Sequence, residues 1–125
     1  MRLLLDSHAF VWWAEANRAL STAARMAITD PANEVLVSVA GLWELVIKAQ
    51  LGKQPPLPDD TETMMVKQGF SLLPITLIHL RRYAPLPQHH KDPFDRMMIA
   101  QALAENIPIV TRDRIFASYG VQVIW

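Results

Sequence analysis

The chain has 125 residues, of which 51% are apolar, and its twelve basic residues balance twelve acidic ones. This composition favours one domain spanning residues 1–125 with a buried core, and it excludes a disordered chain. A net charge of zero lacks the signature of a strongly basic nucleic-acid-binding domain. The absence of cysteine excludes disulfides and thiolate chemistry and fits a cytoplasmic protein. Because Asp6 and His8 interrupt the apolar N-terminus, neither a signal peptide nor a membrane span is expected there.

The first half of the chain predicts two strands and three helices. In order, they are a strand at 2–6, helices at 7–16 and 21–30, a strand at 34–38 and a helix at 39–52. Both strands are short continuous apolar runs, which are typical of strands that are buried on both faces. Ser21 and Ser38 precede helical segments and are expected to act as N-caps.

The second half continues the alternation after a proline-rich loop. In order, it has that loop at 53–60, a helix at 61–69, a strand at 70–75, a helix at 76–84, a loop at 85–91, a helix at 92–106, a strand at 107–111, a short helix or turn at 113–120 and a strand at 121–125. Asp92 as N-cap and Pro93 at the first helical position form a complete helix start. Strands separated by helices predict an α/β fold with a mainly parallel sheet, which binds ligands beyond the carboxyl ends of its strands.

Three aspartates are expected near that edge of the sheet. Asp6 ends the first predicted strand, and Asp113 follows the fourth by two residues. Asp95 shares a helical stripe with Met98 and Ile99, so its carboxylate should point towards the sheet edge rather than to water. Capping and turn formation are the alternative roles for these acids, and for Asp95 the favourable helix dipole supports that alternative.

Glu44 is a fourth candidate, at the edge of the apolar stripe of its helix, where it could reach the same site or remain a solvated flank residue. Four carboxylates from four segments are difficult to hold together unless a cation neutralises them. Oxygen ligands without cysteine favour Mg²⁺ or Mn²⁺ over Zn²⁺. His89 and His90 are adjacent, not at metal-binding helical spacing. They are interpreted as loop residues, with a substrate-binding or supporting role as the alternative.

Four blocks of sequence resemble one known family. They are "LLLDSHAFVWW", "SVAGLWELVIKAQLGK", "HHKDPFDRMMIAQAL" and "IVTRDRIFASYGVQVIW". In this order and spacing they resemble the PIN-domain toxins of type II toxin–antitoxin modules, the VapC-like ribonucleases, from Leu4 to Trp125. The resemblance implies a three-layer α/β/α sandwich, acids that bind Mg²⁺ or Mn²⁺, cleavage of RNA, and inhibition by a cognate antitoxin.

The resemblance also assigns roles to individual residues. The four family acids, which would hold the metal and carry out catalysis, fall on Asp6, Glu44, Asp95 and Asp113. Residues that match supporting positions are Ser7, Asp92 and Thr111, with Asp92 kept as the helix cap. Arginines adjacent to site acids are candidates for phosphate contact, or else ordinary surface residues: Arg96, Arg112 and Arg114.

Two other protein classes with a similar fold require residues that this chain lacks. A response-regulator receiver needs an acid pair after the first strand, and a haloacid-dehalogenase-type phosphatase needs aspartate where His8 stands, so both are excluded. A PIN-like binding module without catalysis stays open as the alternative function. The wide apolar faces of "AFVWWAEA" and "LWELVIKAQL" are expected to form a partner groove, and a homodimer is expected, although core packing explains any one tryptophan equally well.

Overall fold

The computed structural model describes residues 1–125. One or two helices separate each strand from the next along the chain. The elements are β1 (Arg2–Leu5), α1 (Ser7–Ala14), α2 (Thr22–Thr29), β2 (Glu34–Ser38), α3 (Val39–Gln50), α4 (Thr61–Gln68), β3 (Phe70–Leu73), α5 (Leu77–Tyr83), α6 (Pro93–Glu105), β4 (Ile109–Val110), the 3₁₀ helix η1 (Arg114–Tyr119) and β5 (Val123–Ile124). All neighbouring strands pair in parallel, in the order β3-β2-β1-β4-β5. The predicted α/β fold with a parallel sheet is confirmed.

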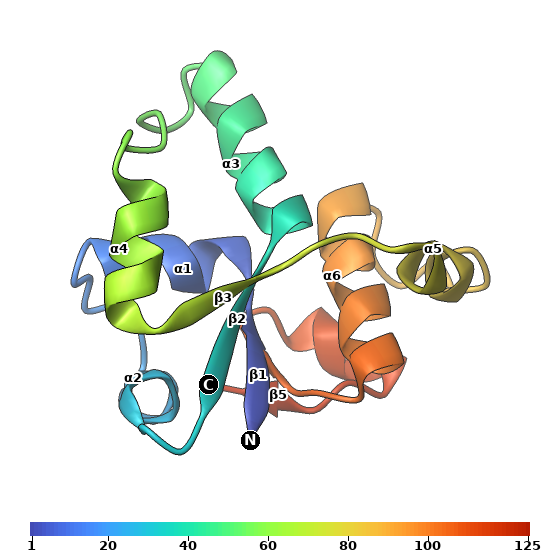
Figure 1. Ribbon diagram of the computed structural model, residues 1–125. Helices are drawn as coiled ribbons and strands as arrows, with labels where there is room; N and C mark the ends of the chain where they lie inside the picture. The colour runs from blue at the N-terminus through green and yellow to red at the C-terminus, as the bar shows by residue number, and fades with distance from the viewer.

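The central strand β1 is buried on both faces because its leucines alternate between two cores. Leu4 packs in one apolar cluster with residues of α6 and η1, whereas Leu3 and Leu5 pack in the other with residues of α1 and α2. Figure 1 shows the resulting three layers, with α1, α2 and α4 on one side of the sheet and α5 and α6 on the other. Helix α3 extends beyond the end of the sheet where β1 and β2 finish.

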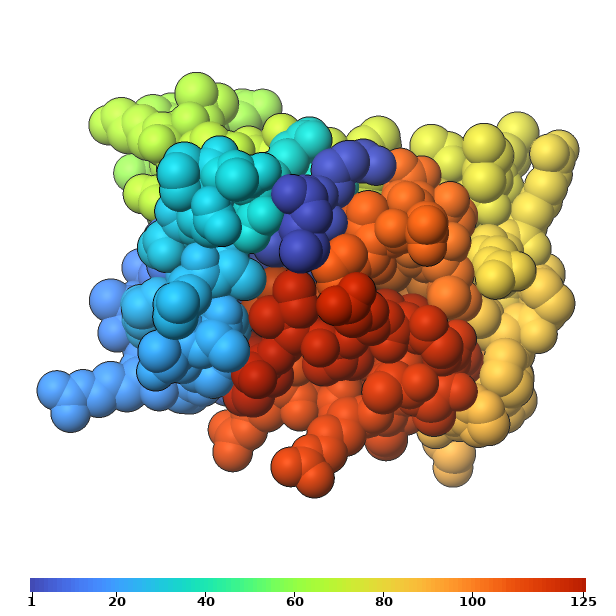
Figure 2. Space-filling view, turned by 90° about the horizontal axis from the view of Figure 1, so that it is seen from below, coloured from blue at the N-terminus to red at the C-terminus, as the bar shows by residue number.

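The opposite edge of the sheet carries the start of β1. Figure 2 views the molecule from this side, where the first residues of the chain lie between the segment that leads into β2 and the segments of α6 and the C-terminus. This view agrees with the central place of β1 between β2 and β4. No helix combines the length and the apolar content that crossing a membrane requires.

Several boundaries differ from the predicted ones. Strand β1 ends at Leu5, so Asp6 is the N-cap of α1 and not the last strand residue. Strand β4 has only two residues instead of five, starting after Pro108, which lacks the N–H that a ladder needs. The predicted caps at Ser21 and Ser38 are confirmed, since each hydroxyl accepts a hydrogen bond from a backbone N–H in the first turn of its helix.

A buried polar contact fixes α6 against the end of β2. The Ser38 hydroxyl donates to Oε1 of Gln101, a residue without solvent exposure. The Gln101 amide in turn donates to the carbonyl of Pro74, 3.3 Å away, just beyond β3. These bonds satisfy the hydrogen-bonding groups of a buried amide in an apolar core. They also attach α6 to the ends of β2 and β3.

Candidate metal centre

Four carboxylates converge from separate segments at the carboxyl ends of three adjacent strands. Asp6 follows β1 as the N-cap of α1, and Asp113 follows β4 as the N-cap of η1. Glu44 lies within α3, which begins directly after β2, and Asp95 lies in the first turn of α6. We call these four residues the acid cluster. It occupies the edge where ligands bind in open parallel sheets.

Asp6 is held by hydrogen bonds to both of its carboxylate oxygens. Only 6% of the residue is exposed. The Ala9 amide donates to Oδ1 at 2.7 Å, and the Thr111 hydroxyl donates to Oδ2 at 2.6 Å. Thr111 Oγ1 also accepts from the backbone N–H of Asp113, at 3.0 Å, so one hydroxyl links two acids of the cluster.

Glu44 is buried in the site, with 5% of its surface exposed, so the alternative of a solvated flank residue is wrong. The Ser7 hydroxyl donates to its Oε1 at 2.5 Å. Lys48, one turn further along α3, lies 3.6 Å from Oε2 and provides partial charge compensation. Because Ser7 is the first residue of α1, this contact ties α1 to α3 beside Asp6.

Asp95 has a strongly perturbed carboxyl group. Its pKa is raised to about 8, mainly by burial and in addition by the neighbouring carboxylates Asp92, Glu44, Asp6 and Asp113. Burial also raises the pKa of Asp6, against the opposing effect of the hydrogen bonds from Thr111 and Ala9. The acids therefore repel one another without sufficient compensating charge.

Asp92 performs the predicted capping role. Its Oδ1 accepts from the backbone N–H groups of Phe94, at 2.8 Å, and Asp95, at 3.1 Å. The helix start is thus satisfied without the Asp95 side chain, which leaves that carboxylate free to face the cluster.

His90 lies at the site, whereas the sequence favoured a loop residue and left a substrate-binding or supporting role as the alternative. Its Nε2 lies 2.9 Å from Oδ2 of Asp95 and 3.1 Å from Oδ2 of Asp113. The adjacent pair His89 and His90 lacks the helical spacing that signals a metal site, so helical periodicity could not reveal it. Its position two residues before the cap of α6 was the available signal, because that loop must lead to the same edge of the sheet.

The three arginines fall into two groups. Arg96 is only 5% exposed, and its guanidinium donates to the carbonyls of Leu86, Pro87 and His90. The prediction that Arg96 contacts phosphate is therefore corrected, since its donors are directed to the loop before α6. Arg112 and Arg114 are exposed on either side of Asp113 and stay candidates for that role.

The donor atoms of the site suit a hard divalent cation. Two sets of side chains can each bring one donor atom within 4.8 Å of the others: His90, Asp95 and Asp113 form one, and Glu44, Asp92 and Asp95 form the second. Asp95 belongs to both. Carboxylate oxygens predominate, and the burial and the repulsion that raise the pKa of Asp95 are what a bound cation would offset. Asp6 lies outside both sets, and its oxygens accept from Ala9 and Thr111.

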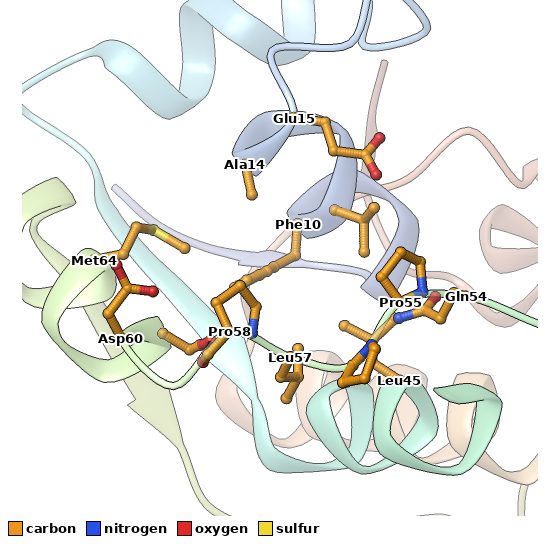
Figure 3. Close-up of a pocket in the computed structure, with 13 residues that line it drawn as sticks. Phe10, Ala14, Glu15, Leu45, Gln54, Pro55, Leu57, Pro58, Asp60 and Met64 are labelled. Atoms are coloured by element: carbon orange, nitrogen blue, oxygen red, sulfur yellow. Dashed lines mark hydrogen bonds between the residues drawn. The ribbon is translucent and has the colours of Figure 1, made fainter. Parts of the chain in front are cut away.

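An apolar groove of about 410 Å³ lies on another part of the surface. Its walls come from α1, α3, α4 and the proline-rich loop at 53–60, as the close-up in Figure 3 shows. Phe10 and Ala14 of α1 lie on one side and Leu45 of α3 and Leu57 of the loop on another. We call this feature the apolar groove.

Comparison with known proteins identifies the family. Residues 3–122 match the PIN domain, and the chain belongs to the PIN-domain family. It is 30% identical over 119 residues to Ribonuclease VapC22 of Mycobacterium tuberculosis, covering 94% of this chain and 91% of that protein.

Solved structures share the fold at lower identity. VapBC2 from Rickettsia felis, bound to a DNA fragment from its promoter, aligns with a TM-score of 0.70 and 15% identity over 98% of this chain and 97% of that chain. VapBC-1 from nontypeable Haemophilus influenzae aligns with a TM-score of 0.70 and 15% identity over 98% and 96% of the two chains. The resemblance to a PIN domain and the predicted sandwich fold are both confirmed.

The raised pKa of Asp95 predicts a specific dependence of stability on pH. Between pH 3.8 and about 8 the Asp95 carboxyl keeps a proton in the folded protein that it has lost in the unfolded chain. The stabilisation that this bound proton gives to the folded state is complete at low pH and is lost as pH rises through 8. The free energy of unfolding should fall by up to about 1.4 kcal/mol per pH unit in that window. Asp95→Asn should weaken this decline and be more stable than wild type at pH 8.5.

The measurement is urea unfolding in EDTA at several pH values. Asp59→Asn is the matched control, because Asp59 is exposed in the loop at 53–60. A decline with pH that is as steep in Asp95→Asn as in wild type would show that the pKa of Asp95 is not raised.

Proposed function

We propose that this chain is a divalent-metal-dependent endoribonuclease, the toxin of a type II toxin–antitoxin module. The observation that carries the proposal is the acid cluster, in which carboxylates from four segments, two of them buried, meet with too little compensating charge. Membership of the PIN-domain family and the 30% identity to a protein named as a ribonuclease support hydrolysis of RNA. We further propose that the 125 residues act as one domain in the cytoplasm.

Asp6, Glu44, Asp95 and Asp113 would hold the cation, Mg²⁺ or Mn²⁺. When bound, such a cation supplies Lewis-acid polarisation of the scissile phosphate and lowers the pKa of water. Thr111 and Ser7 keep Asp6 and Glu44 oriented through the hydrogen bonds described above.

The remaining residues of the site have roles in proton transfer and in phosphate binding. One of the carboxylates that hold the cation would also take a proton from the water that attacks phosphorus. Arg112 and Arg114 are exposed beside Asp113 and can donate to phosphate oxygens. In-line attack by that water would leave a 5′ phosphate and a 3′ hydroxyl.

The alternative is a PIN-like binding module without catalysis. A module of this kind has no need of uncompensated buried acids, because repulsion between them reduces stability unless a cation is present. The presence of all four acids, with hydroxyl donors in place on two of them, favours the enzyme.

The apolar groove is the surface that we assign to an antitoxin. The structures of similar fold are VapBC assemblies, which supports a protein partner. Apolar side chains line the groove, and the acidic residues Glu15 and Asp60 stand at its border. This chemistry fits an amphipathic segment that combines apolar side chains with a basic residue.

The groove uses the expected helices but not the expected tryptophans. Trp12 and Trp13 are partly buried against the core, where Trp13 packs on Phe70 and Trp12 on Trp125. Helix α1 contributes Phe10, Val11 and Ala14 to the groove instead. A homodimer stays a prediction, for which the exposed apolar side chains Leu77 and Ile78 of α5 offer surface.

Substitution of the acid cluster should separate activity from folding. Asp6→Asn, Asp95→Asn and Asp113→Asn each remove a charge that the cation requires while keeping nearly the same volume. We expect each variant to lose cleavage of a fluorescent RNA by at least about 100-fold and to retain the circular dichroism spectrum of wild type. EDTA should abolish wild-type cleavage, and added Mg²⁺ or Mn²⁺ should restore it.

Asp59→Asn serves as the control in the same assay, since it removes an exposed acid distant in sequence from the cluster. Full cleavage by Asp95→Asn, or cleavage by wild type that persists in EDTA, would remove the metal from the proposed mechanism.

Filling the groove should block the antitoxin without affecting the fold. Ala14 is exposed and lines the groove, so Ala14→Trp should occupy space that the partner needs. We expect this variant to lose co-purification with the protein encoded beside its gene, while Ala23→Trp, on the exposed surface of α2, keeps it. Equal recovery of the complex with both variants would assign the partner to another surface.

A further inference from the structure

The ring of His90 is oriented by hydrogen bonds on both of its nitrogens. The backbone N–H of Asp92 donates to Nδ1 at 3.2 Å, so in the neutral ring the proton resides on Nε2. That N–H donates to Oδ2 of Asp113, 3.1 Å away, and the same nitrogen lies 2.9 Å from Oδ2 of Asp95. This geometry joins His90 to both carboxylates, as a donor to Asp113 and in close contact with Asp95. It leaves Nε2 without the lone pair that a metal ligand needs.

The backbone of His90 is also fixed in place. Its N–H donates to the hydroxyl of Tyr119 at 2.7 Å, although the two residues are 29 positions apart. The ring packs edge-on against Phe116, with centroids 6.0 Å apart. Both partners belong to η1, the helix that Asp113 caps. His90 is thus attached to the element that carries one of its two carboxylates.

Buried Arg96 completes the support of this loop. Its Nη1 donates to the carbonyls of Pro87, at 2.8 Å, and His90, at 3.3 Å, and lies 3.4 Å from the Tyr119 hydroxyl. Burying a guanidinium to 5% exposure is costly unless its N–H donors are paired. Here most of the partners are backbone carbonyls of the loop at 85–91. Arg96 follows Asp95 directly in α6, so the same helix holds one acid and the loop that presents His90.

His90 is the side chain that contacts both Asp95 and Asp113. Asp95 belongs to α6 and Asp113 to the turn before η1, and like charges at this separation repel. Asp113 uses Oδ1 to accept from the Ile115 N–H at 3.0 Å, which leaves Oδ2 for His90 and for the site. With 37% of its side chain exposed, Asp113 has room to rotate away if that donor is lost.

We propose that His90 is a positioning residue of the metal centre, whose Nε2, in contact with both carboxylates, holds Asp95 and Asp113 at the spacing needed to share one cation. The inference rests on the proposed metal-dependent function. It assigns His90 a contact with the two acids and not with the cation. Each carboxylate oxygen has a second lone pair, so accepting from His90 does not prevent it from facing a cation.

The test is Mn²⁺ binding to the full chain, followed by the electron paramagnetic resonance signal of free Mn²⁺. His90→Ala should bind Mn²⁺ about 10- to 100-fold more weakly than wild type, as found when groups that orient metal ligands are removed. His90→Gln retains an N–H donor and should bind more tightly than His90→Ala. His89→Ala is the matched control, because His89 packs on Tyr119 and touches no acid of the cluster, and it should bind as wild type does.

Electron spin-echo measurements on the Mn²⁺-loaded wild type provide a second readout that a purely structural role would not affect. We expect no coupling to a directly coordinated ¹⁴N nucleus, and circular dichroism should show that each variant is folded. Strong ¹⁴N coupling that disappears in His90→Ala would make His90 a ligand and overturn the positioning role.

The failures of the two proposals are distinguishable. If wild type does not bind Mn²⁺, the metal dependence itself is wrong, and this inference falls with it. If wild type and His90→Ala bind equally, or if His90→Gln is no better than His90→Ala, only the role of His90 is overturned.

Discussion

Repulsion between clustered, partly or fully buried carboxylates is the constraint on which the rest of the site depends. Asp6, Glu44, Asp95 and Asp113 come from four segments, and each is held by the backbone or by a side-chain donor in a position that its neighbours disfavour. The parallel sheet makes this possible, because the carboxyl ends of β1, β2 and β4 place consecutive helix starts side by side. The stability of the core offsets the repulsion that remains, which a bound cation would relieve.

The acid cluster and the apolar groove share two helices. Asp6 caps α1, and the next turns of that helix bring Phe10 and Ala14 to the groove. In α3, Glu44 faces the acids while the following residue, Leu45, lines the groove. A partner seated in the groove would therefore contact the helices that hold two of the four acids, which offers a direct structural route from binding to inhibition.

Much of this architecture could be predicted from sequence, for identifiable reasons. Continuous apolar runs specified β1 and β2, and acids placed directly after strands were expected at the carboxyl edge. The burial of Glu44 depends on how far α3 rotates against α1, which periodicity does not determine. The role of Arg96 was assigned incorrectly and that of His90 was left open. The reason is that tertiary contacts, among them those of the Tyr119 hydroxyl, set the path of the loop at 85–91. Local sequence carries no signal of those contacts.

The central claim is that the acid cluster binds a divalent cation, and calorimetric titration with Mn²⁺ at pH 7 tests it most directly. With a pKa of about 8, Asp95 is mostly protonated at this pH, so binding must displace its proton. Titrations in buffers of different ionisation enthalpy give the number of protons released. The account predicts saturable binding with release of about one proton in wild type and much less in Asp95→Asn. Absence of Mn²⁺ binding, or binding with no proton release in wild type, would contradict it.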